Sequence, residues 1–388
     1  MNIRNLVPAL AIVTLTSTAG FAADAAPAVT YKGWVDAVVQ YTDDDTKNSA
    51  TTKKNDGSGS LRFTGEASVQ AAWKVTDALT THINVWVDPG NGTDNVNVRE
   101  AYFNWAFADG LSWTMGKYID HIGWISTEPT GPNYLFINAD TIGYREIYGN
   151  DVMGAALNIA PKGSPLSGSV HVTNGYFTGS DGNSHIYSSP NSATRENSDL
   201  GFGLDVTYAL PNELGSINAE LAYDMHSGNT TGFGGVAPQN TAVASGLGGD
   251  VLLLGLNATV KPVKILTLGA EIQYLTLGES KNSTGVNQKD GVNRTQGLLL
   301  ANVVIEKAPA NMSVSALVQY VSIDRDLPAN AKKEDRVYVG VAVLTNPLVS
   351  SNFGLNYEFG YFDKKSINGT NNNDLKGFTL AVEGLISF

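Results

Sequence analysis

The residue types that carry out covalent or metal chemistry are scarce in this chain of 388 residues. It contains no Cys, which excludes thiolate metal sites, iron–sulfur clusters and cysteine nucleophiles. Its histidines never form the spacing His-Glu-x-x-His, and the sequence has neither a P-loop nor a Gly-x-Ser-x-Gly elbow. We therefore predict no enzyme, no cofactor and no metal site, and we interpret the five histidines as wall or loop residues: His82, His121, His171, His185 and His226.

Two acidic features keep weaker alternatives open. Asp120 and His121 form an acid–imidazole pair, although no obvious Ser or water-activating pair accompanies them. The acidic runs 43–45 and 88–94 offer carboxylates of the kind that bind Ca²⁺, but acidic turns are common in proteins without a metal. Neither feature is specific enough to predict a site.

The first 22 residues have the organisation of a secretory signal peptide. Arg4 supplies a basic start, an apolar centre follows over residues 6–15, and Gly20-Phe21-Ala22 is a small-x-small cleavage site. The apolar centre is too short to anchor the chain in a membrane as a helix. We expect cleavage near Ala22 and export from the cytoplasm.

The composition excludes several classes of protein. The 25 basic and 37 acidic residues give a net charge of -12, which argues against nucleic acid and anionic lipid surfaces as partners. After residue 22 no apolar run reaches the roughly 18 residues that a membrane-spanning helix needs. Apolar residues are spread along the whole chain, so a disordered protein is also excluded.

Apolar residues alternate with polar ones from near residue 29 to the end of the chain. In residues 216–224 apolar side chains occupy the odd positions, and polar or small side chains occupy the even ones. Residues 62–75, 266–274 and 353–361 alternate in the same way. A period of two is that of a β-strand, because a helix repeats every 3.6 residues.

This period predicts sixteen strands joined by two alternating kinds of connection. Short turns follow the even-numbered strands, and mostly longer loops rich in Gly and Asn follow the odd-numbered ones. An even number of antiparallel strands with this asymmetry is typical of an outer-membrane barrel. The predicted strands are 29–42, 60–76, 79–89, 95–107, 111–118, 143–160, 167–178, 197–210, 214–226, 247–261, 265–278, 294–307, 311–323, 334–346, 352–363 and 375–388.

A large soluble β-sandwich would also alternate, and three features favour the barrel. Most predicted strands have 11–14 residues, against about 5–6 in soluble proteins. In strands 1–3 and 8–16 the apolar face carries no charge within its alternating core, where a Lys or Arg would cost about 2–4 kcal/mol. Aromatic residues lie near strand ends, as interfacial girdles do: Tyr41, Trp73, Phe107, Tyr118, Tyr208, Tyr223, Tyr361 and Phe388. We predict an all-β fold, a transmembrane antiparallel up-and-down β-barrel over residues 23–388.

The last strand resembles the C-terminal signal that outer-membrane barrels present to their assembly machinery. Its alternate positions are apolar and it ends in an aromatic residue: Phe378, Leu380, Val382, Gly384, Ile386 and Phe388. We therefore expect outer-membrane lipid and the barrel assembly machinery as partners.

A barrel of sixteen strands is too wide for side chains to fill, which predicts an aqueous channel. The faces assigned inward in strands 1–3 and 8–16 carry twelve acids: Asp36, Glu66, Asp88, Asp199, Asp205, Glu220, Asp224, Glu271, Glu306, Glu334, Glu358 and Glu383. They carry six bases: Lys32, Arg62, Lys74, Lys261, Arg294 and Arg336. An acidic wall concentrates cations, although salt screens its field over about 8 Å. We predict a mild preference for cations.

The connection 119–142 is the longest, and it is unusually apolar for a loop in water. It has no Lys or Arg, and its acids and histidine are Asp120, His121, Glu128 and Asp140. Folding into the lumen would explain both facts, and Arg99, Lys117 and Arg145 would then face its acids across a constriction. The alternatives are an outer lid or a segment that is partly strand. A slip in the alternation also predicts a β-bulge near Arg99 and Glu100.

Residues 98–175 carry a distinctive run of short motifs. It reads Val98-Arg-Glu-Ala-Tyr-Phe, then Gly110-Leu-Ser-Trp-Thr-Met-Gly-Lys117-Tyr, then Gly123, and it ends in Asn174-Gly175. The motif resembles the β-barrel porin family described as OmpL-like, and phosphate-selective porins share part of it. The resemblance implies an outer-membrane pore for small solutes, with Arg99 and Lys117 at the matching positions. The acidic lumen departs from an anion-selective pore, which argues against phosphate as the solute.

The sequence therefore predicts a Gram-negative outer-membrane porin for passive diffusion of small hydrophilic solutes or ions, and many porins are homotrimers. Two alternatives stay open: a solute-selective channel with its binding site in 119–142, and a non-conducting barrel whose loops act in adhesion or structure. The predicted pore-lining residues are Asp36, Glu66, Lys74, Asp88, Arg99, Glu100, Lys117, Asp120, Glu128, Arg145, Glu220, Glu271, Arg336, Glu358 and Glu383.

Overall fold

The computed structural model describes most of the strands and part of the connections. The described residues are 29–48, 54–55, 59–88, 95–125, 133, 135–138, 141–147, 151–176, 200–225, 250–277, 280–281, 287–289, 292–306, 308, 312–325, 332–345, 352–368 and 371–388. Within them no helix is long and apolar enough to cross a bilayer. The predicted signal peptide, Glu128 and the side chains of Asp88 and Arg145 lie outside this described part.

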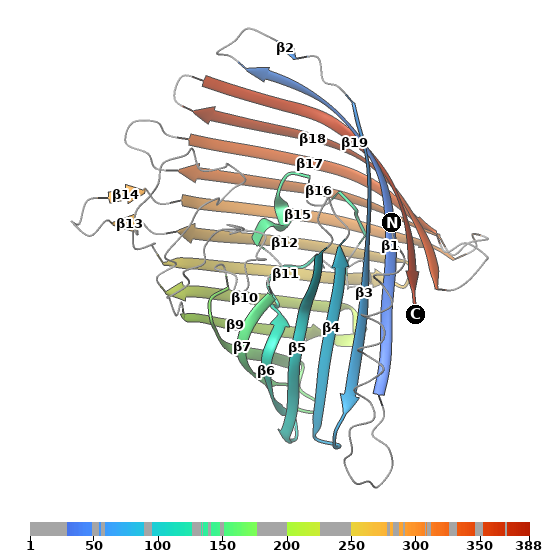
Figure 1. The fold of residues 1–388 in the computed structure, drawn as a ribbon, viewed down its shortest axis with the longest axis vertical. Coiled ribbons are helices and arrows are strands. Elements are labelled where there is room, and N and C mark those ends of the chain that lie inside the picture. The colour runs from blue at the N-terminus through green and yellow to red at the C-terminus, as the bar shows by residue number, and fades with distance from the viewer. Residues whose placement is uncertain are drawn as a thin grey trace.

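Sixteen long strands and the two-residue β2 (Lys54–Asn55) form one antiparallel sheet that closes into a barrel (Figure 1). The long strands are β1 (Val29–Asn48), β3 (Ser60–Lys74), β4 (Leu79–Asp88), β5 (Asn95–Ala108), β6 (Leu111–Ile119), β7 (Asp151–Ile159), β8 (Leu166–Thr173), β9 (Leu200–Leu210), β10 (Gly215–Met225), β11 (Val251–Val263), β12 (Leu266–Leu277), β15 (Val292–Ile305), β16 (Met312–Arg325), β17 (Lys332–Thr345), β18 (Phe353–Asn368) and β19 (Asn371–Ser387). A separate hairpin pairs β13 (Ser280–Lys281) with β14 (Asn287–Lys289). The predicted fold class is confirmed.

The barrel closes where the first strand meets the last. β1 pairs with β3 along one edge and with β19 along the other, so that Trp34 lies opposite both Ser68 and Ser387. In Figure 1 these strands lie side by side at the right of the view. Closure leaves no long strand with an unpaired edge, which removes the template for aggregation that an open sheet presents.

All sixteen predicted strands are present, but the start of one prediction is wrong. Strand β7 begins at Asp151 rather than at residue 143, and residues 144–147 form a short 3-10 helix, η4 (Tyr144–Ile147). Gly143 has a φ of 69°, a left-handed conformation that interrupts an extended chain. Ile142 and Ile147 are almost fully buried, so their apolar character reflects packing inside the barrel.

The short turn predicted between residues 261 and 265 is present, but it lies later in the chain than predicted. Pro262 lies within β11, inside the register shift between Val260 and Val263, and the turn itself is formed by Lys264 and Ile265. A proline is tolerated there because a bulge releases its position from the ladder of hydrogen bonds.

The two faces of the wall differ in polarity as the alternation predicts. Large apolar side chains such as Phe63 and Leu299 point outward and are 71% and 65% exposed, forming the apolar belt of a transmembrane barrel. The interleaved positions point inward and carry most of the buried polar residues. Tyr118 was expected in an outer girdle, and that prediction is wrong, because it follows Ser112 and Thr114 on the inward side of β6 and is buried.

The predicted β-bulge in β5 is confirmed. Asn84 lies opposite Glu100 and the next residue, Val85, lies opposite Val98, so that Arg99 is the extra residue. The Arg99 guanidinium lies 4.2 Å above the ring of Trp86, which faces the interior. A bulge places consecutive residues on one side of a strand, which brings Arg99 and Glu100 to the inner face together.

Candidate functional site

The segment after β6 lies against the inner face of the wall from β10 to β12. Glu271 of β12 accepts hydrogen bonds from the backbone N–H of Trp124 at 2.9 Å and from the hydroxyl of Tyr144 at 3.1 Å. Glu220 of β10 accepts from the backbone N–H of Gly123 at 3.1 Å. Burial and the Glu271 carboxylate raise the pKa of Tyr144 well above its ordinary value, so its hydroxyl keeps the proton that it donates. Two predicted pore-lining acids are therefore acceptors for this segment.

Two arginines hold the other end of the same segment through its carbonyl groups. Arg294 of β15 donates to the carbonyl of Gly143 at 2.5 Å, and Arg336 of β17 donates to that of Ile142 at 2.9 Å. Arg336 also pairs with Glu334 at 2.6 Å. Cationic donors on backbone carbonyls satisfy groups that burial would otherwise leave unpaired.

The segment extends along the wall as far as β18 and β1. Glu358 of β18 accepts from the backbone N–H of Asn138 at 3.0 Å and from the hydroxyl of Tyr338. Gln40 of β1 donates to the side-chain oxygen of Asn138 at 2.6 Å. The described parts of the connection between β6 and β7 lie within the space that the strands enclose (Figure 1).

Apolar packing holds the same segment in place. Ile142 and Ile147 belong to a buried cluster with the inward side chains of Leu253, Leu275 and Ile323, all 1% exposed or less. Burying such a side chain contributes about 1.5–3 kcal/mol. Sequence reasoning missed this core, although the runs Leu252-Leu253-Leu254 and Leu298-Leu299-Leu300 signal strands that are covered on both faces.

A glycine in the wall makes room for Trp124. Gly269 faces inward on β12, and a Cβ atom there would overlap the Trp124 ring. The indole N–H of Trp124 donates to the hydroxyl of Thr259 on the adjacent β11 at 2.7 Å. The ring is thus fixed by shape on one side and by a hydrogen bond on the other.

The wall from β3 to β9 borders a cavity instead. The cavity has a volume of about 560 Å³ and is bounded by seven strands, including Ile119 at the end of β6, and by His121 in the connection that follows. Among the described residues that line this cavity, the acids are Glu100 and Asp205, and there is no Lys or Arg. The remaining lining is largely hydroxyl, amide and imidazole groups, which suits water and hydrophilic solutes.

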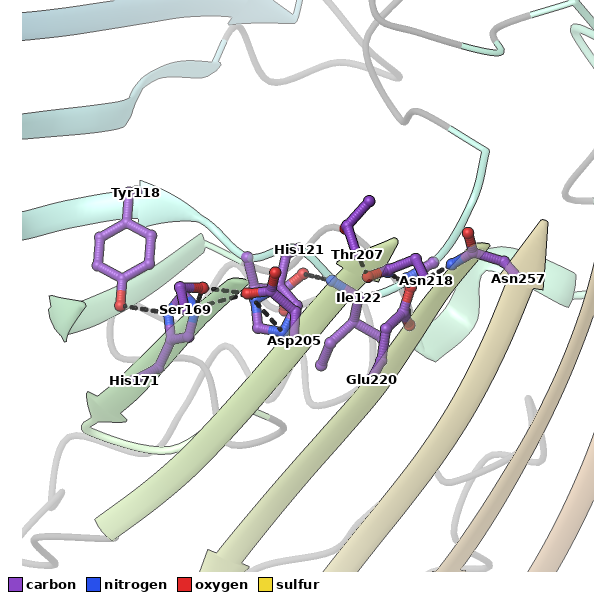
Figure 2. A network of polar contacts seen from close by, with 12 residues as sticks. Tyr118, His121, Ile122, Ser169, His171, Asp205, Thr207, Asn218, Glu220 and Asn257 are labelled. Carbon is purple, nitrogen blue, oxygen red and sulfur yellow. Dashed lines mark hydrogen bonds and ion pairs between the residues drawn. The ribbon is translucent and has the colours of Figure 1, made fainter. Parts of the chain in front are cut away.

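The cavity contains a cluster of titratable side chains from three separate segments (Figure 2). The rings of His121 and His171 stack with centroids 4.3 Å apart. The Nε2 atom of His171 lies 3.3 Å from Asp205 Oδ1, and that of His121 lies 3.8 Å from the same oxygen. The hydroxyl of Ser169 bonds to both His171 and Asp205, and the hydroxyl of Tyr118 lies 3.1 Å from His171 Nδ1.

This cluster is not arranged as a Ser–His–Asp catalytic triad. In a triad the acid bonds to one ring nitrogen and the serine to the other. Here Asp205 and Ser169 both approach Nε2 of His171, and Tyr118 occupies Nδ1. Burial and the neighbouring His171 lower the pKa of His121 to about 4, although Asp205 acts in the opposite direction, so His121 is neutral at pH 7.

Two further predicted pore-lining acids, Glu100 and Asp120, differ in what surrounds them. Glu100 lines the cavity and accepts from His82 and Asn84, each at 3.1 Å. Asp120 is buried and accepts from the backbone N–H of Ile122 at 3.1 Å.

The inner wall around the barrel closure carries three more predicted pore-lining acids, Asp36, Glu66 and Glu383. Asp36 accepts from the backbone N–H of Glu66 at 2.9 Å, across the β1–β3 pair. Glu383 of β19 is buried and lies 3.4 Å from the side-chain amide of Asn356.

Two predicted bases lie away from the cavity. Lys74 pairs with Asp77 at 2.7 Å in the turn after β3 and is 54% exposed. Lys117 follows Trp113 and Met115 on the outward-facing positions of β6, and its ammonium donates to the carbonyl of Val98 at 2.6 Å. Arg99 lies on the ring of Trp86 and does not line the cavity either. The described cavity lining therefore contains no Lys or Arg.

Comparison with known proteins gives no match to a family model, and no curated protein matches the sequence. Among solved structures, the chain is similar to a loop L8 deletion mutant of OmpT, an outer membrane protein of Vibrio cholerae (TM-score 0.58, 13% identity, 94% of this chain and 100% of that chain). It is also similar to the outer membrane channel DcaP of Acinetobacter baumannii (0.58, 14%, 95% and 100%) and to an anion-selective porin from Comamonas acidovorans (0.55, 13%, 93% and 100%).

These similarities show the fold. It is the closed sixteen-stranded barrel of outer-membrane porins and channels. At identities of 14% or less, the similarity extends to the fold alone.

Proposed function

We propose that this protein is a porin, a water-filled channel through which small hydrophilic solutes and ions diffuse passively across the outer membrane. The observation that carries this proposal is the unequal filling of the lumen. One side is packed by the segment after β6, and the opposite side retains a cavity of about 560 Å³ whose lining includes hydroxyl, amide, imidazole and carboxyl side chains. The packed segment acts as a constriction that sets the size limit, and the cavity is the passage beside it.

A preference for cations is the second part of the proposal. The described lining of the cavity has the carboxylates of Glu100 and Asp205 without a Lys or Arg, and His121 carries no charge at pH 7. Charges on the wall of a narrow aqueous passage act at short range, so salt screens them less than it screens charges across an open lumen. Cations would therefore be favoured in the passage.

Not all of the acids on the inner wall contribute equally to the proposed preference for cations. Glu220, Glu271 and Glu358 are engaged by backbone N–H groups of the packed segment, and their main task is to hold it. Neutralising them would displace the constriction as well as remove charge. Glu100 and Asp205 are the acids that we expect to set the ionic preference, because they line the cavity.

The test is conductance in a planar lipid bilayer. The purified mature protein is reconstituted, and the reversal potential is measured across a KCl gradient. Stepwise conductance with a reversal potential on the cation side is the expected result. Inserted protein without conductance would contradict the porin proposal, and a reversal potential on the anion side would contradict the ionic preference alone.

Export and assembly complete the proposal. We infer that the signal peptide is cleaved near Ala22, that the strand ending in Phe388 addresses the barrel assembly machinery, and that the chain is an OmpL-like member of the porins. A homotrimer is supported by the trimer form in which OmpT of Vibrio cholerae was solved. N-terminal sequencing of the protein from outer-membrane fractions tests the cleavage and the location, and light scattering of the detergent-solubilised protein tests the trimer.

A further inference from the structure

Three side chains that face the cavity have the types and spacing of a metal site. His121 comes from the segment after β6, His171 from β8 and Asp205 from β9, and one ligand atom of each lies within 4.8 Å of the others. Their exposed fractions as side chains are 19%, 6% and 16%, so the cluster is shielded but reachable from the passage. Neither ring nitrogen of His121 makes a hydrogen bond of normal geometry with the described residues.

The distances are close to those of a coordinated ion. Two ligands bound to a tetrahedral Zn²⁺ at 2.0–2.1 Å lie about 3.3 Å apart. Asp205 Oδ1 lies 3.3 Å from His171 Nε2 and 3.8 Å from His121 Nε2. The two imidazole rings are stacked, so at least one of them must turn about its side-chain bonds for both lone pairs and the carboxylate to meet one ion. Imidazole ligands favour Zn²⁺, Ni²⁺ or Cu²⁺ over Mg²⁺ and Ca²⁺, which prefer oxygen.

The surroundings of His171 complete the arrangement. Metal-binding histidines use their second nitrogen to donate to a neighbouring acceptor, which fixes the tautomer. The hydroxyl oxygen of Tyr118 lies 3.1 Å from His171 Nδ1, so a proton on Nδ1 leaves the lone pair of Nε2 facing Asp205. Ser169 contacts the same two side chains and offers a hydroxyl oxygen beside the site, as Figure 2 shows.

We propose that His121, His171 and Asp205 bind one divalent transition-metal ion in the wall of the passage. Three protein ligands leave a fourth position for water on the cavity side, which is the coordination of an exchangeable ion. The proposal deepens the proposed porin function, because it identifies a cation that the passage recognises. A bound ion would also offset the Asp205 charge and lower the monovalent cation current.

Direct binding tests the site independently of conduction. The mature protein in detergent is stripped with EDTA and transferred to chelator-free buffer, and ZnCl₂ is titrated by calorimetry. One Zn²⁺ per chain is expected. Co²⁺ in its place should give the intense visible absorption of a tetrahedral site. The Tyr118→Phe variant should bind Zn²⁺ about 10–100-fold more weakly, as loss of an outer-shell partner does, and His171→Ala more weakly still.

His82→Ala is the matched control, since His82 faces the same cavity but pairs with Glu100. It should bind Zn²⁺ as the wild type does. Circular dichroism verifies that each variant keeps the barrel. Absence of Zn²⁺ binding in the wild type, or equal binding by the His171→Ala and His82→Ala variants, would overturn the proposal. A barrel that conducts without binding Zn²⁺ contradicts the metal site alone, whereas one that binds Zn²⁺ without conducting contradicts the porin alone.

Discussion

The walls from β10 to β18 and from β3 to β9 belong to one barrel, yet their inner faces differ in what lies against them. The first is covered by the segment after β6 through hydrogen bonds and an apolar cluster. The second borders a cavity lined by polar groups. Both walls alternate outward apolar and inward residues, so the difference lies in which inward residues each strand carries. Inward leucines and isoleucines recruit the segment, and inward hydroxyls, amides and imidazoles leave water in place.

Acidic side chains have different roles on the two walls. A carboxylate such as Glu271 on the packed side accepts two donors from the segment, whereas Asp205 on the opposite wall faces the cavity. Acidic residues on an inner face are therefore anchors or charges according to what lies against them. Variants on the two sides should have different effects on the pore.

The largest effect is expected from Glu271→Ala on the packed side. The substitution removes the acceptor of hydrogen bonds from Trp124 and Tyr144, and leaving a buried donor unsatisfied costs about 1–3 kcal/mol. The segment should loosen from the wall, and single-channel conductance should rise. Ile272→Ala on the outward face of the same strand is the control. Equal conductance of the wild type and Glu271→Ala would show that this anchor does not shape the passage.

A smaller change on the same side should come from Gly269→Ala. The new methyl group would overlap the Trp124 ring, and overpacking of this kind costs about 1–3 kcal/mol. The ring must move, so the tryptophan signal in near-ultraviolet circular dichroism and the conductance should both change. Gly384→Ala is the matched control, because its new methyl group would have neighbours no closer than 3.7 Å. If the two variants behave alike, Trp124 does not depend on the space at Gly269.

On the wall that borders the cavity, Glu100→Gln and Asp205→Asn should alter ionic preference with little change in conductance. Each removes one of the two carboxylates of the described cavity lining, so the double variant should lose most of the cation preference and each single variant part of it. Reversal potentials in a KCl gradient with EDTA measure this. Glu306→Gln is the control, since Glu306 pairs with Lys264 at the end of the barrel and is 51% exposed. An unchanged reversal potential in the double variant would remove these carboxylates from the mechanism.

The smallest effect concerns the pH dependence that His121 contributes. Its pKa of about 4 lies below the ordinary 6.5, so the ring stays neutral between these values, where an ordinary histidine would gain a positive charge. His121→Gln should therefore match the wild type in reversal potential from pH 7 to pH 5. Towards pH 4 the wild type should lose more cation preference, because its ring becomes charged. A difference that develops between pH 7 and pH 5.5 would contradict the lowered pKa.

The extent to which the sequence predicts this protein differs between the wall and the interior. The period of two locates all sixteen strands, because a wall between lipid and water imposes the same alternation on each of them. It also locates the bulge at Arg99, where the alternation slips. It fails at residues 143–147, whose apolar side chains suit a strand and a buried segment equally well. Tyr118 was misplaced for a similar reason, since an aromatic residue near a strand end suits a girdle or a lumen.

The sequence by itself determines the excess of acidic residues, which is a matter of composition. It also determines the alternation and the number of strands, because the requirement that one face of each strand meets lipid acts locally. Only the tertiary structure decides which acids hold the constricting segment and which line the passage. It alone also brings His121, His171 and Asp205 within 4.8 Å of one another. The physical reason is that these neighbours lie on segments up to 84 residues apart, and only closure of the barrel and packing of the segment against one wall bring them together.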